Sequence, residues 1–349
     1  MRSEVEVPVT RIVEFDALID VRSPAEFAAD RIPGARNLPV LDDEERARVG
    51  TLYVQVSPFE ARRLGAVLTA RNIAAHIERE LSDQPKNWKP LVYCWRGGER
   101  SESMAHVLRH VGWPAARLIG GYRAYRRAVR DDLDRLPQAF AFRVVCGRTG
   151  SGKSCLLRAL AEAGAQVLDL EALARHRGSV LGTLPDDPQP TQKWFESLLR
   201  ERLAAFDSAR PVFVEAESRR IGRLTVPDAL IAAVRQGECL QIEAELPVRI
   251  ALLEAEYQHL VADVDALCAK LALLTHLHGR EQIAAWQSLA RSGRTTELVG
   301  ELLERHYDPA YRRSTDRNFV RLRDAAHLSL TGVRDEDFAR LARQLAAET

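Results

Sequence analysis

The feature that most restricts the fold of this chain is the octapeptide GRTGSGKS at residues 147–154. It fits the pattern G-x-x-x-x-G-K-[S/T] and stands between an apolar segment, 142–146, and a helix-like segment, 153–163. The glycines let the backbone curl so that several N–H groups point at an anion, and the following helix N-terminus adds partial positive charge. The pattern therefore predicts a strand, a phosphate-binding P-loop and a helix in succession, with an ordinary glycine turn as the alternative.

The P-loop pattern predicts a diphosphate-type ligand rather than ATP in particular. Lys153 can reach a terminal phosphate and Ser154 can ligate Mg²⁺, which makes Mg²⁺ a candidate cofactor without a firm metal site. A nucleoside triphosphatase also needs an aspartate at the end of a neighbouring strand. The strand expected at 211–215 offers Glu215 and Glu217 instead, and these could equally form a solvated strand end. The candidate diphosphate contacts are Gly147, Arg148, Thr149, Gly150, Ser151, Gly152, Lys153 and Ser154.

Two further candidate side chains lie at the end of the strand expected at 166–170 and shortly after it. Asp169 stands where that strand should end, close to the expected phosphate ligand, so it is a candidate for substrate or metal contact. An aspartate in this position can equally cap the next helix. His176 is a candidate catalytic group or a packed core side chain, and both alternatives stay open.

A second loop carries a cysteine. Cys94 follows the strand expected at 90–93 and precedes a helix expected at 100–111. A thiol at a helix N-terminus among arginines should have a lowered pKa and act as a nucleophile, and the loop N–H groups can cradle an anion or a persulfide. A buried structural cysteine is the alternative, but it does not explain the neighbouring glycines and arginines. The candidate cradle residues are Trp95, Arg96, Gly97, Gly98 and Arg100.

The remaining composition bounds the class of protein. The 349 residues suggest about two domains, and five scattered cysteines without a C-x-x-C pair argue against disulfides and zinc. No apolar run reaches the roughly 18 residues of a membrane span, and the N-terminus lacks a signal core, so we expect a cytoplasmic protein with no membrane partner.

Strand and helix patterns alternate along both halves of the chain. Strands are expected at 17–21 and 116–119 besides 90–93, and a second series includes 239–245, followed by helical spacing over 247–306. Such alternation is typical of α/β folds with parallel sheets. A charged segment with Pro137, residues 131–139, indicates a linker. We therefore expect a first α/β domain at 1–135 with the Cys94 loop, and a P-loop α/β domain at 140–349 with a helical C-terminal part.

The first half resembles a rhodanese domain. The carrying segments are IDVRSPAEF at 19–27, Arg31 in a histidine-like position followed by IPGARN at 32–37, and LIGGY at 118–122. The Cys94 loop is placed like the rhodanese active-site loop. Two departures stand out: Cys94 to Arg100 is C-x5-R, one residue longer than usual and the size that dual-specificity phosphatases use for phosphate, and the stretch 37–90 is longer than in a minimal rhodanese.

A rhodanese domain followed by a P-loop domain resembles the bacterial tRNA 2-selenouridine synthases. Further similar segments are YCWRGG at 93–98, DLEALA with HRGS within 169–179, QKWFE at 192–196 and EAESRRIG at 215–222. The resemblance implies an enzyme, a transferase that replaces the sulfur of wobble 2-thiouridine with selenium. It implies selenophosphate and geranyl diphosphate as co-substrates, an S-geranyl-2-thiouridine intermediate, no tightly bound cofactor, and selenophosphate synthetase as a source of the donor.

These implications lead to two hypotheses about the loops. Cys94 and its N–H cradle would receive selenium, with Arg96 and Arg100 steadying the anion, while Lys153 and the P-loop would bind the diphosphate of geranyl diphosphate. The main alternative is a Cys-dependent phosphatase or sulfurtransferase fused to a nucleotide-binding, kinase-like domain. A non-enzymatic module in which both loops only sense anions is a further alternative.

A tRNA partner also requires contacts to phosphate. The net charge is only +1, so charge must be concentrated locally to hold a polyanion. A solvated surface role is the alternative for each arginine. The candidate contacts are Arg123, Arg126, Arg127 and Arg130, then Arg219, Arg220 and Arg223, then Arg312, Arg313 and Arg317.

Overall fold

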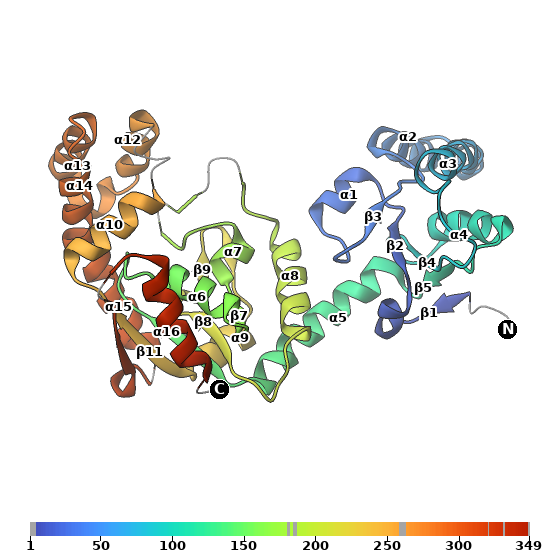
Figure 1. Ribbon diagram of the computed structural model, residues 1–349. Coiled ribbons are helices and arrows are strands. Elements are labelled where there is room, and N and C mark those ends of the chain that lie inside the picture. The colour runs from blue at the N-terminus through green and yellow to red at the C-terminus, as the bar shows by residue number, and fades with distance from the viewer. Residues whose placement is uncertain are drawn as a thin grey trace. The chain divides into compact units, whose positions relative to one another are not determined.

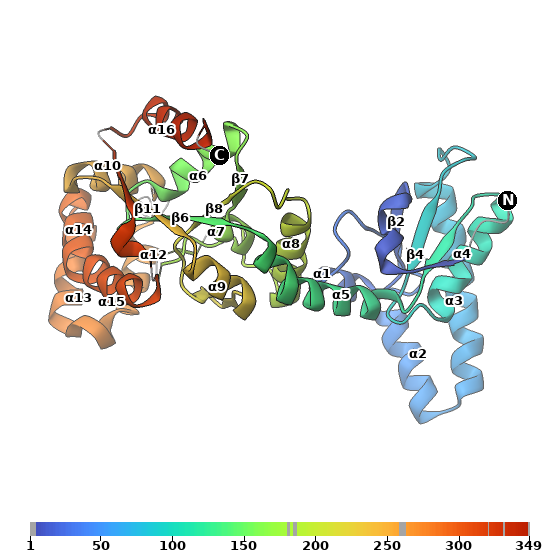
Figure 2. The same ribbon diagram turned by 90° about the horizontal axis from the view of Figure 1, so that it is seen from below.

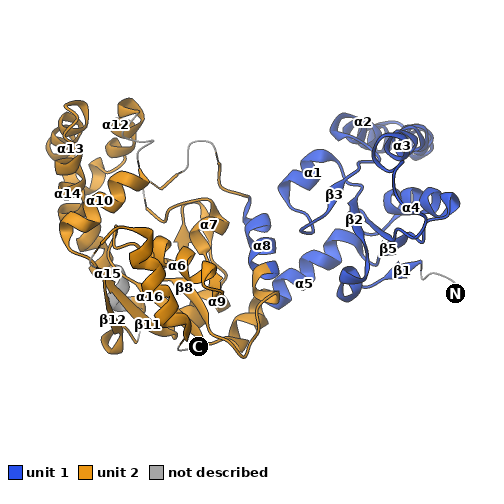
Figure 3. Cartoon of the chain, viewed as in Figure 1, with its two compact units in different colours: residues 1–132, 191–201 blue, residues 133–190, 202–349 orange. Residues whose placement is uncertain are grey.

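The computed structural model describes residues 5–179, 182–183, 187–257, 263–319, 321–330 and 332–347, without the side chains of 314–317. The chain divides into two compact units, coloured separately in Figure 3. Unit 1 comprises residues 1–132 and 191–201, and unit 2 comprises 133–190 and 202–349. Most of one helix, α8 (Gln192–Ala204), therefore belongs to unit 1. The domains expected at 1–135 and 140–349 did not include this return of the chain.

Unit 1 is built on a five-stranded parallel sheet in the order β1-β5-β4-β2-β3. Its strands are β1 (Glu6–Val7), β2 (Ala17–Asp20), β3 (Arg36–Asn37), β4 (Pro90–Tyr93) and β5 (Ala116–Leu118). The central strand β4 is buried throughout, as its unbroken apolar sequence predicts for a parallel sheet covered on both faces. The expected parallel α/β domain is confirmed.

The helices of unit 1 follow the local sequence signals. Its main helices are α1 (Pro24–Ala29), α2 (Asp43–Gln55), α3 (Pro58–Glu80), α4 (Glu99–Val111) and α5 (Gly121–Arg135, whose last turn belongs to unit 2), with a short 3₁₀ helix η1 (Val9–Glu14) near the start. A capping box of Ser23 and Glu26 begins α1, as the Ser-Pro signal predicts. Helices α2 and α3 lie side by side in Figures 1 and 2 and account for the extra length between residues 37 and 90.

The boundary expected within 131–139 agrees with the division of the units between Asp132 and Leu133, but the expected linker is helical. Helix α5 continues to Arg135, and a 3₁₀ turn, η2 (Leu136–Ala139), follows directly. Four-residue spacing brings Tyr125, Val129 and Leu133 to one buried face of α5. The charges that suggested a linker lie on the other, exposed face of the same helix.

A buried ion pair holds the start of the rhodanese-like motif. The Arg22 guanidinium is 1% exposed and donates to both carboxylate oxygens of Asp20, with Nη2 at 2.6 Å from Oδ2. It also donates to the backbone carbonyl of Asp30 at 2.7 Å. Burial disfavours the charged guanidinium, but Asp20 outweighs that effect and the pKa of Arg22 is raised. The pair is therefore desolvated and held by several hydrogen bonds.

We expect Asp20→Ala to lower the free energy of unfolding by about 3–5 kcal/mol, because it leaves a buried guanidinium without its counter-ion. Urea unfolding followed by circular dichroism measures the change. The matched control is Glu80→Ala, which breaks the half-exposed ion pair with Arg36 and should cost about 0–1 kcal/mol. Equal losses in the two variants would contradict a structural role for the buried pair.

Unit 2 has its own five-stranded parallel sheet in the order β12-β11-β6-β8-β7. Its strands are β6 (Phe142–Cys146), β7 (Gln166–Leu168), β8 (Val212–Glu215), β11 (Glu238–Glu243) and β12 (Ala326–Ser329). The edge strand β12 was not predicted. A small antiparallel pair, β9 (Arg220–Ile221) and β10 (Leu224–Thr225), lies apart from this sheet.

The helices of unit 2 confirm the expected helical C-terminal part. They are α6 (Lys153–Glu162), α7 (Leu170–Ala174), α9 (Asp228–Arg235), α10 (Leu246–Glu256), α12 (Val264–Ala272), α13 (Thr275–Arg291), α14 (Thr295–Leu302), a π turn η3 (Leu303–Tyr307), α15 (Asp308–Asn318), a 3₁₀ turn η4 (Leu322–Asp324) and α16 (Asp335–Ala347). Helices α12, α13 and α14 share a core centred on Trp286, and Figure 1 shows them with α10 as a group beside the sheet. None of the described helices combines the length and apolar character that a membrane crossing requires.

Candidate functional site

The Cys94 thiol lies where β4 ends and the loop to α4 begins. It is 3% exposed, and its sulfur lies 3.3 Å from the Ser101 hydroxyl and 3.9 Å from the carbonyl oxygen of Gly98. Ser101 sits in the first turn of α4 and was not foreseen from the sequence. Its spacing, seven residues after the cysteine and just inside the expected helix, is the signal that could have identified it.

The surroundings of Cys94 favour the thiolate. Burial alone would raise its pKa, but the Ser101 hydroxyl, the backbone N–H groups of Ser101 and Arg96 and the charge of Arg100 together lower it below the usual value. Two helices, α4 and α5, also begin beside the loop, and helix N-termini stabilise nearby negative charge. The expected lowering of the Cys94 pKa therefore comes from identifiable hydrogen-bond donors and from the charge of Arg100.

We expect Ser101→Ala to move the thiolate titration of Cys94 to higher pH. The hydroxyl stabilises the charged form, so its removal raises the pKa, and a smaller fraction of the thiol is ionised at neutral pH. The pH profile of iodoacetamide alkylation, corrected with Cys94→Ser, measures the midpoint. Ser103→Ala, which removes a hydroxyl bonded only to the Glu99 carbonyl, is the control and should leave the midpoint unchanged. A downward shift in Ser101→Ala would contradict this assignment.

The loop is closed by backbone contacts that require glycine. Gly97 and Gly121 both have positive φ, +70° and +57°. A β-carbon on Gly121 would lie 2.3 Å from the Cys94 carbonyl oxygen and 2.5 Å from the Gly97 nitrogen. The Tyr122 N–H donates to the same Cys94 carbonyl at 2.8 Å. The start of α5 and the cysteine loop are thus joined backbone to backbone.

The two arginines of the loop differ in their surroundings. Arg100 donates to the Glu26 carboxylate at 2.8 Å, and Arg46 approaches the same oxygen at 3.2 Å. Arg96 is exposed and makes no ion pair with any described residue. Arg96 is therefore the freer of the two for a bound anion, whereas Arg100 is held on Glu26 beside the loop.

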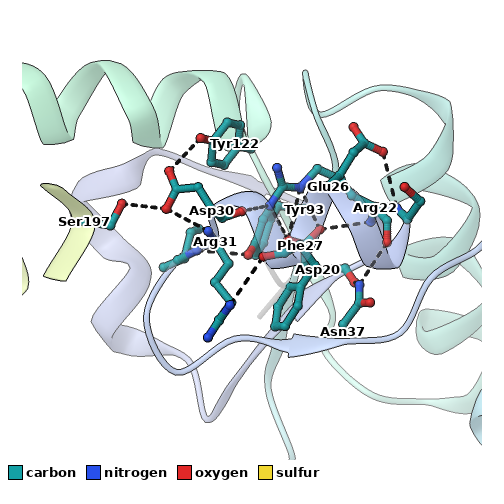
Figure 4. A network of polar contacts seen from close by, with 12 residues as sticks. Asp20, Arg22, Glu26, Phe27, Asp30, Arg31, Asn37, Tyr93, Tyr122 and Ser197 are labelled. Atoms are coloured by element: carbon teal, nitrogen blue, oxygen red, sulfur yellow. Dashed lines mark hydrogen bonds and ion pairs between the residues drawn. The ribbon is translucent and has the colours of Figure 1, made fainter. Parts of the chain in front are cut away.

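A polar network around Asp30 and Arg22, drawn in Figure 4, includes Tyr122, the residue whose N–H bonds to the Cys94 carbonyl. The Tyr122 hydroxyl donates to the Asp30 carboxylate at 2.6 Å, and Ser197 of α8 donates to its other oxygen at 2.9 Å. The Tyr122 ring stacks on Trp95 with 5.2 Å between centroids, and the Arg22 guanidinium lies 4.1 Å from the centroid of the same ring. The residue that follows the cysteine is thereby tied to the buried ion pair.

The P-loop has the predicted strand, loop and helix. Gly150 and Gly152 adopt positive φ, +78° and +85°, and Gly152 is the N-cap of α6. The Lys153 ammonium donates to the carbonyl of Gly147 at 2.8 Å and to that of Arg148 at 3.3 Å. The Lys153 ammonium therefore lies over the P-loop, the same loop whose N–H groups would bind an anion.

Carboxylates gather next to the P-loop, at the ends of β7 and β8. The Ser154 hydroxyl donates to Glu171 at 3.4 Å, and the Glu171 backbone N–H donates to Glu215 at 2.7 Å. Glu215 is 2% exposed and Glu217 is half-buried, so the alternative of a solvated strand end was wrong. Glu171 was not on the list of candidates. The available signal was the position of this acidic residue, two residues after Asp169 at the expected strand end.

Burial and mutual repulsion favour the protonated forms of these carboxyls. Burial, followed by repulsion from Glu217, raises the pKa of Glu171 to about 8. Burial, followed by the charges of Asp169, Glu171 and Glu217, raises the pKa of Glu215 well above its usual range. A nearby cation would reverse this effect by favouring the charged forms.

The fit of Mg²⁺ depends on what else is bound. Among the described residues, no group of three or more His, Cys, Asp or Glu side chains is placed to hold a metal ion. Asp169 accepts from the Ala172 N–H at 2.8 Å and so caps α7, the alternative that the sequence left open. Ser154 and Glu171 offer two oxygen ligands. Mg²⁺ commonly takes few protein ligands and completes its shell with water and substrate phosphates, so a bound diphosphate would have to supply the rest.

His176 lies in a loop against the same carboxylates. It is 5% exposed, and burial, followed by the charge of Lys270, lowers its pKa, so the ring is neutral at pH 7. Its Nδ1 has no hydrogen-bond partner among the described residues. A β-carbon on Gly178 would lie 2.5 Å from a Glu217 oxygen and 2.7 Å from a Glu171 oxygen. The loop from His176 to Gly178 therefore packs directly on the carboxylate group.

The candidate tRNA contacts are not equally available. On α5, Arg123, Arg127 and Arg130 are exposed, but Arg126 pairs with Glu196. Arg219 pairs with Asp228 at 2.7 Å, and Arg223 donates to the carbonyls of Gln189 and Pro190. Arg220, Arg312 and Arg313 are exposed, and the side chain of Arg317 lies outside the described part of the chain. Helix α5, which carries these three exposed arginines, begins beside the Cys94 loop.

Comparison with known proteins finds a family match for each part of the chain that carries one of these loops. Residues 9–128 match the family model of the rhodanese-like domain, and residues 140–278 match that of the tRNA 2-selenouridine synthase AAA domain. A tRNA 2-selenouridine synthase of Alcanivorax borkumensis is 32% identical over 326 residues, which cover 84% of this chain and 88% of that protein. This chain belongs to the tRNA 2-selenouridine synthase family.

Other members of the tRNA 2-selenouridine synthase family match over a shorter length. The proteins of that name from Nitrosomonas europaea and Marinobacter nauticus are 36% and 37% identical, each over 69% of this chain. The matches span 63% and 65% of those two relatives. Both candidate loops lie within segments that match the two family models.

Proposed function

We propose that this protein converts the wobble 2-thiouridine of tRNA to 2-selenouridine through an S-geranyl-2-thiouridine intermediate. The observation that carries the proposal is that one member of the tRNA 2-selenouridine synthase family combines a loop whose cysteine has a lowered pKa with a P-loop and its lysine. Two anionic co-substrates, selenophosphate and geranyl diphosphate, match these two loops.

In the first reaction the sulfur of 2-thiouridine attacks C1 of the geranyl group. A C–S bond forms, the C–O bond to the diphosphate breaks, diphosphate leaves, and N3 of the base loses its proton. The P-loop N–H groups and Lys153 would hold the diphosphate and stabilise the charge that develops on it. Mg²⁺, if it takes part, would be held by Ser154, Glu171 and the diphosphate itself, and would supply additional positive charge.

In the second reaction selenium replaces the alkylated sulfur at C2 of the base, and geranyl thiol leaves. Selenium in selenophosphate is already at the oxidation level of selenide, so a Cys94 S–Se bond would require an oxidant. Attack of the Cys94 thiolate on phosphorus needs none: an S–P bond forms, the P–Se bond breaks, and protonation gives hydrogen selenide. Water then cleaves the S–P bond and releases phosphate. The phosphate-sized C-x5-R loop and the lowered pKa of Cys94 support this route.

The tRNA partner would be held through phosphate contacts, with the target base turned out of its stack. The exposed arginines of α5, Arg123, Arg127 and Arg130, are the best placed of the candidates because α5 begins at the Cys94 loop. Selenophosphate synthetase is the proposed source of the selenium donor.

The test is incubation of the purified protein with tRNA that contains 2-thiouridine, first with geranyl diphosphate and then with selenophosphate. Mass spectrometry of the digested nucleosides should show S-geranyl-2-thiouridine after the first addition and 2-selenouridine after the second. Selenouridine formed without geranyl diphosphate would overturn the alkylated intermediate, and the absence of both products would overturn the proposal.

The alternative of a Cys-dependent phosphatase keeps one observation in its favour, the C-x5-R spacing from Cys94 to Arg100. Release of phosphate from an aryl phosphate by the wild type, but not by Cys94→Ser, would support it. Arg100 is engaged by Glu26, which leaves Arg96 as the exposed guanidinium of the loop.

A further inference from the structure

An apolar pocket lies next to the P-loop in unit 2. It is walled by Thr149, Leu253, Tyr257, Leu298, Val299 and Leu302, among others, and encloses a cavity of about 70 Å³ that opens to solvent. Most of its wall is formed by residues of α10, α12 and α14, which carry none of the candidate site residues named from the sequence.

The pocket adjoins the P-loop. Thr149 is both a P-loop residue and a wall of the pocket. Its carbonyl accepts from Arg249 of α10 at 2.9 Å, and Arg249 is fixed in turn by a buried ion pair with Asp308 at 2.6 Å. A β-carbon on Gly150 would meet Leu253 of α10 at 2.9 Å. Helix α10 is therefore packed tightly against the P-loop, and a ligand held by the loop has the pocket beside it.

The chemistry of the walls selects for hydrocarbon. None of the described residues that line the pocket carries a charged side chain, and its polar groups are limited to two threonines and two tyrosines. Burial raises the pKa of Tyr257 and of Tyr307 to about 12, so both phenols are uncharged at neutral pH. A nucleoside would bring a polar base and sugar to these walls and leave hydrogen-bonding groups without partners, which is costly. An isoprenoid chain brings none.

We propose that this pocket holds the hydrocarbon tail of the diphosphate ester whose head binds to the P-loop, and that it sets the preferred chain length. This inference rests on the proposed function and adds to it the part of the protein that distinguishes one prenyl diphosphate from another. Each additional buried methylene contributes up to about fourfold in affinity. The pocket should therefore make geranyl diphosphate bind much more tightly than inorganic diphosphate.

The experiment narrows the pocket at its rim. Val299 is half-buried, so Val299→Phe can fill space without disturbing the core. Isothermal titration calorimetry of the full chain compares geranyl diphosphate, dimethylallyl diphosphate and inorganic diphosphate. We expect Val299→Phe to weaken geranyl diphosphate at least about tenfold and to leave inorganic diphosphate unchanged. Val299→Ala should improve binding of the longer farnesyl diphosphate. Leu277→Phe is the control, because Leu277 is 58% exposed on α13 and does not line the pocket.

The outcomes separate this inference from the proposed function. A wild type that binds geranyl and inorganic diphosphate equally, or a Val299→Phe variant that binds all three ligands like the wild type, overturns the pocket assignment even if S-geranyl tRNA is formed. A wild type that prefers geranyl diphosphate and loses that preference in Val299→Phe supports the pocket, and absence of S-geranyl tRNA in the same preparation would then count against the proposed function alone.

Discussion

Replacement of Cys94 by serine should abolish selenation of tRNA and leave S-geranylation within about twofold of the wild type. The serine hydroxyl stays protonated at neutral pH, so the loop loses the nucleophile that the Ser101 hydroxyl, the backbone N–H groups and Arg100 stabilise as a thiolate. Loss of a nucleophile commonly costs at least about a thousandfold in rate. Quantification of 2-selenouridine by mass spectrometry, from tRNA supplied already geranylated, isolates the affected reaction.

The matched control for this variant is Cys155→Ser. Cys155 lies on α6 directly after the P-loop and is half-exposed, and burial raises the pKa of its thiol. It lacks the hydroxyl and backbone N–H donors that lower the pKa of Cys94. It should keep both reactions. Full selenation by Cys94→Ser would remove Cys94 from the mechanism, and loss of geranylation in the same variant would show that the cysteine loop serves both steps.

Replacement of Lys153 by alanine should lower S-geranylation by about a hundred- to a thousandfold, the usual range for the loss of one preorganised donor at developing charge. Lys153 lies across the P-loop on the carbonyls of Gly147 and Arg148, so its removal does not disturb the hydrophobic core. Single-turnover geranylation with excess protein measures the chemical step. Selenation of pre-geranylated tRNA should continue, because it depends on the other loop.

Lys86→Ala is the control for Lys153→Ala, since Lys86 is exposed and lies in unit 1, far along the chain from the P-loop. It should leave geranylation unchanged. Unchanged geranyl transfer in Lys153→Ala would instead refute the role of the P-loop as the diphosphate site. A variant that loses selenation of pre-geranylated tRNA as well would indicate a shared tRNA-binding defect.

The features that the sequence predicted well are those encoded over a few consecutive residues. The strand of residues 142–146, the P-loop and the start of α6 follow one another directly, and each is specified by its own residue types. The same holds for β4 and for the capping signal at Ser23-Pro24. Local sequence therefore located both candidate loops and the parallel α/β character of both units.

What the sequence did not reveal depends on residues that meet only in the folded chain. Ser101 and Glu171 become functional candidates because of what lies opposite them, the Cys94 sulfur and the Ser154 hydroxyl. Strand β12 pairs with β11, which lies more than eighty residues earlier in the sequence, so no local pattern predicts this strand. The charged residues at the end of α5 suggested a linker, but they lie on the exposed face of a helix whose other face is buried.

The return of residues 191–201 to unit 1 means that the two units are interleaved along the gene rather than joined end to end. A protein truncated at residue 135 would lack α8, and Asp30 would lose the Ser197 hydroxyl that helps to fix Tyr122 behind the cysteine loop. Neither unit can therefore be excised as a single uninterrupted segment. Dissection of the two chemistries is better done with point variants in the intact chain than by cutting it, and any shuffling of these domains would have to carry α8 along with the first unit.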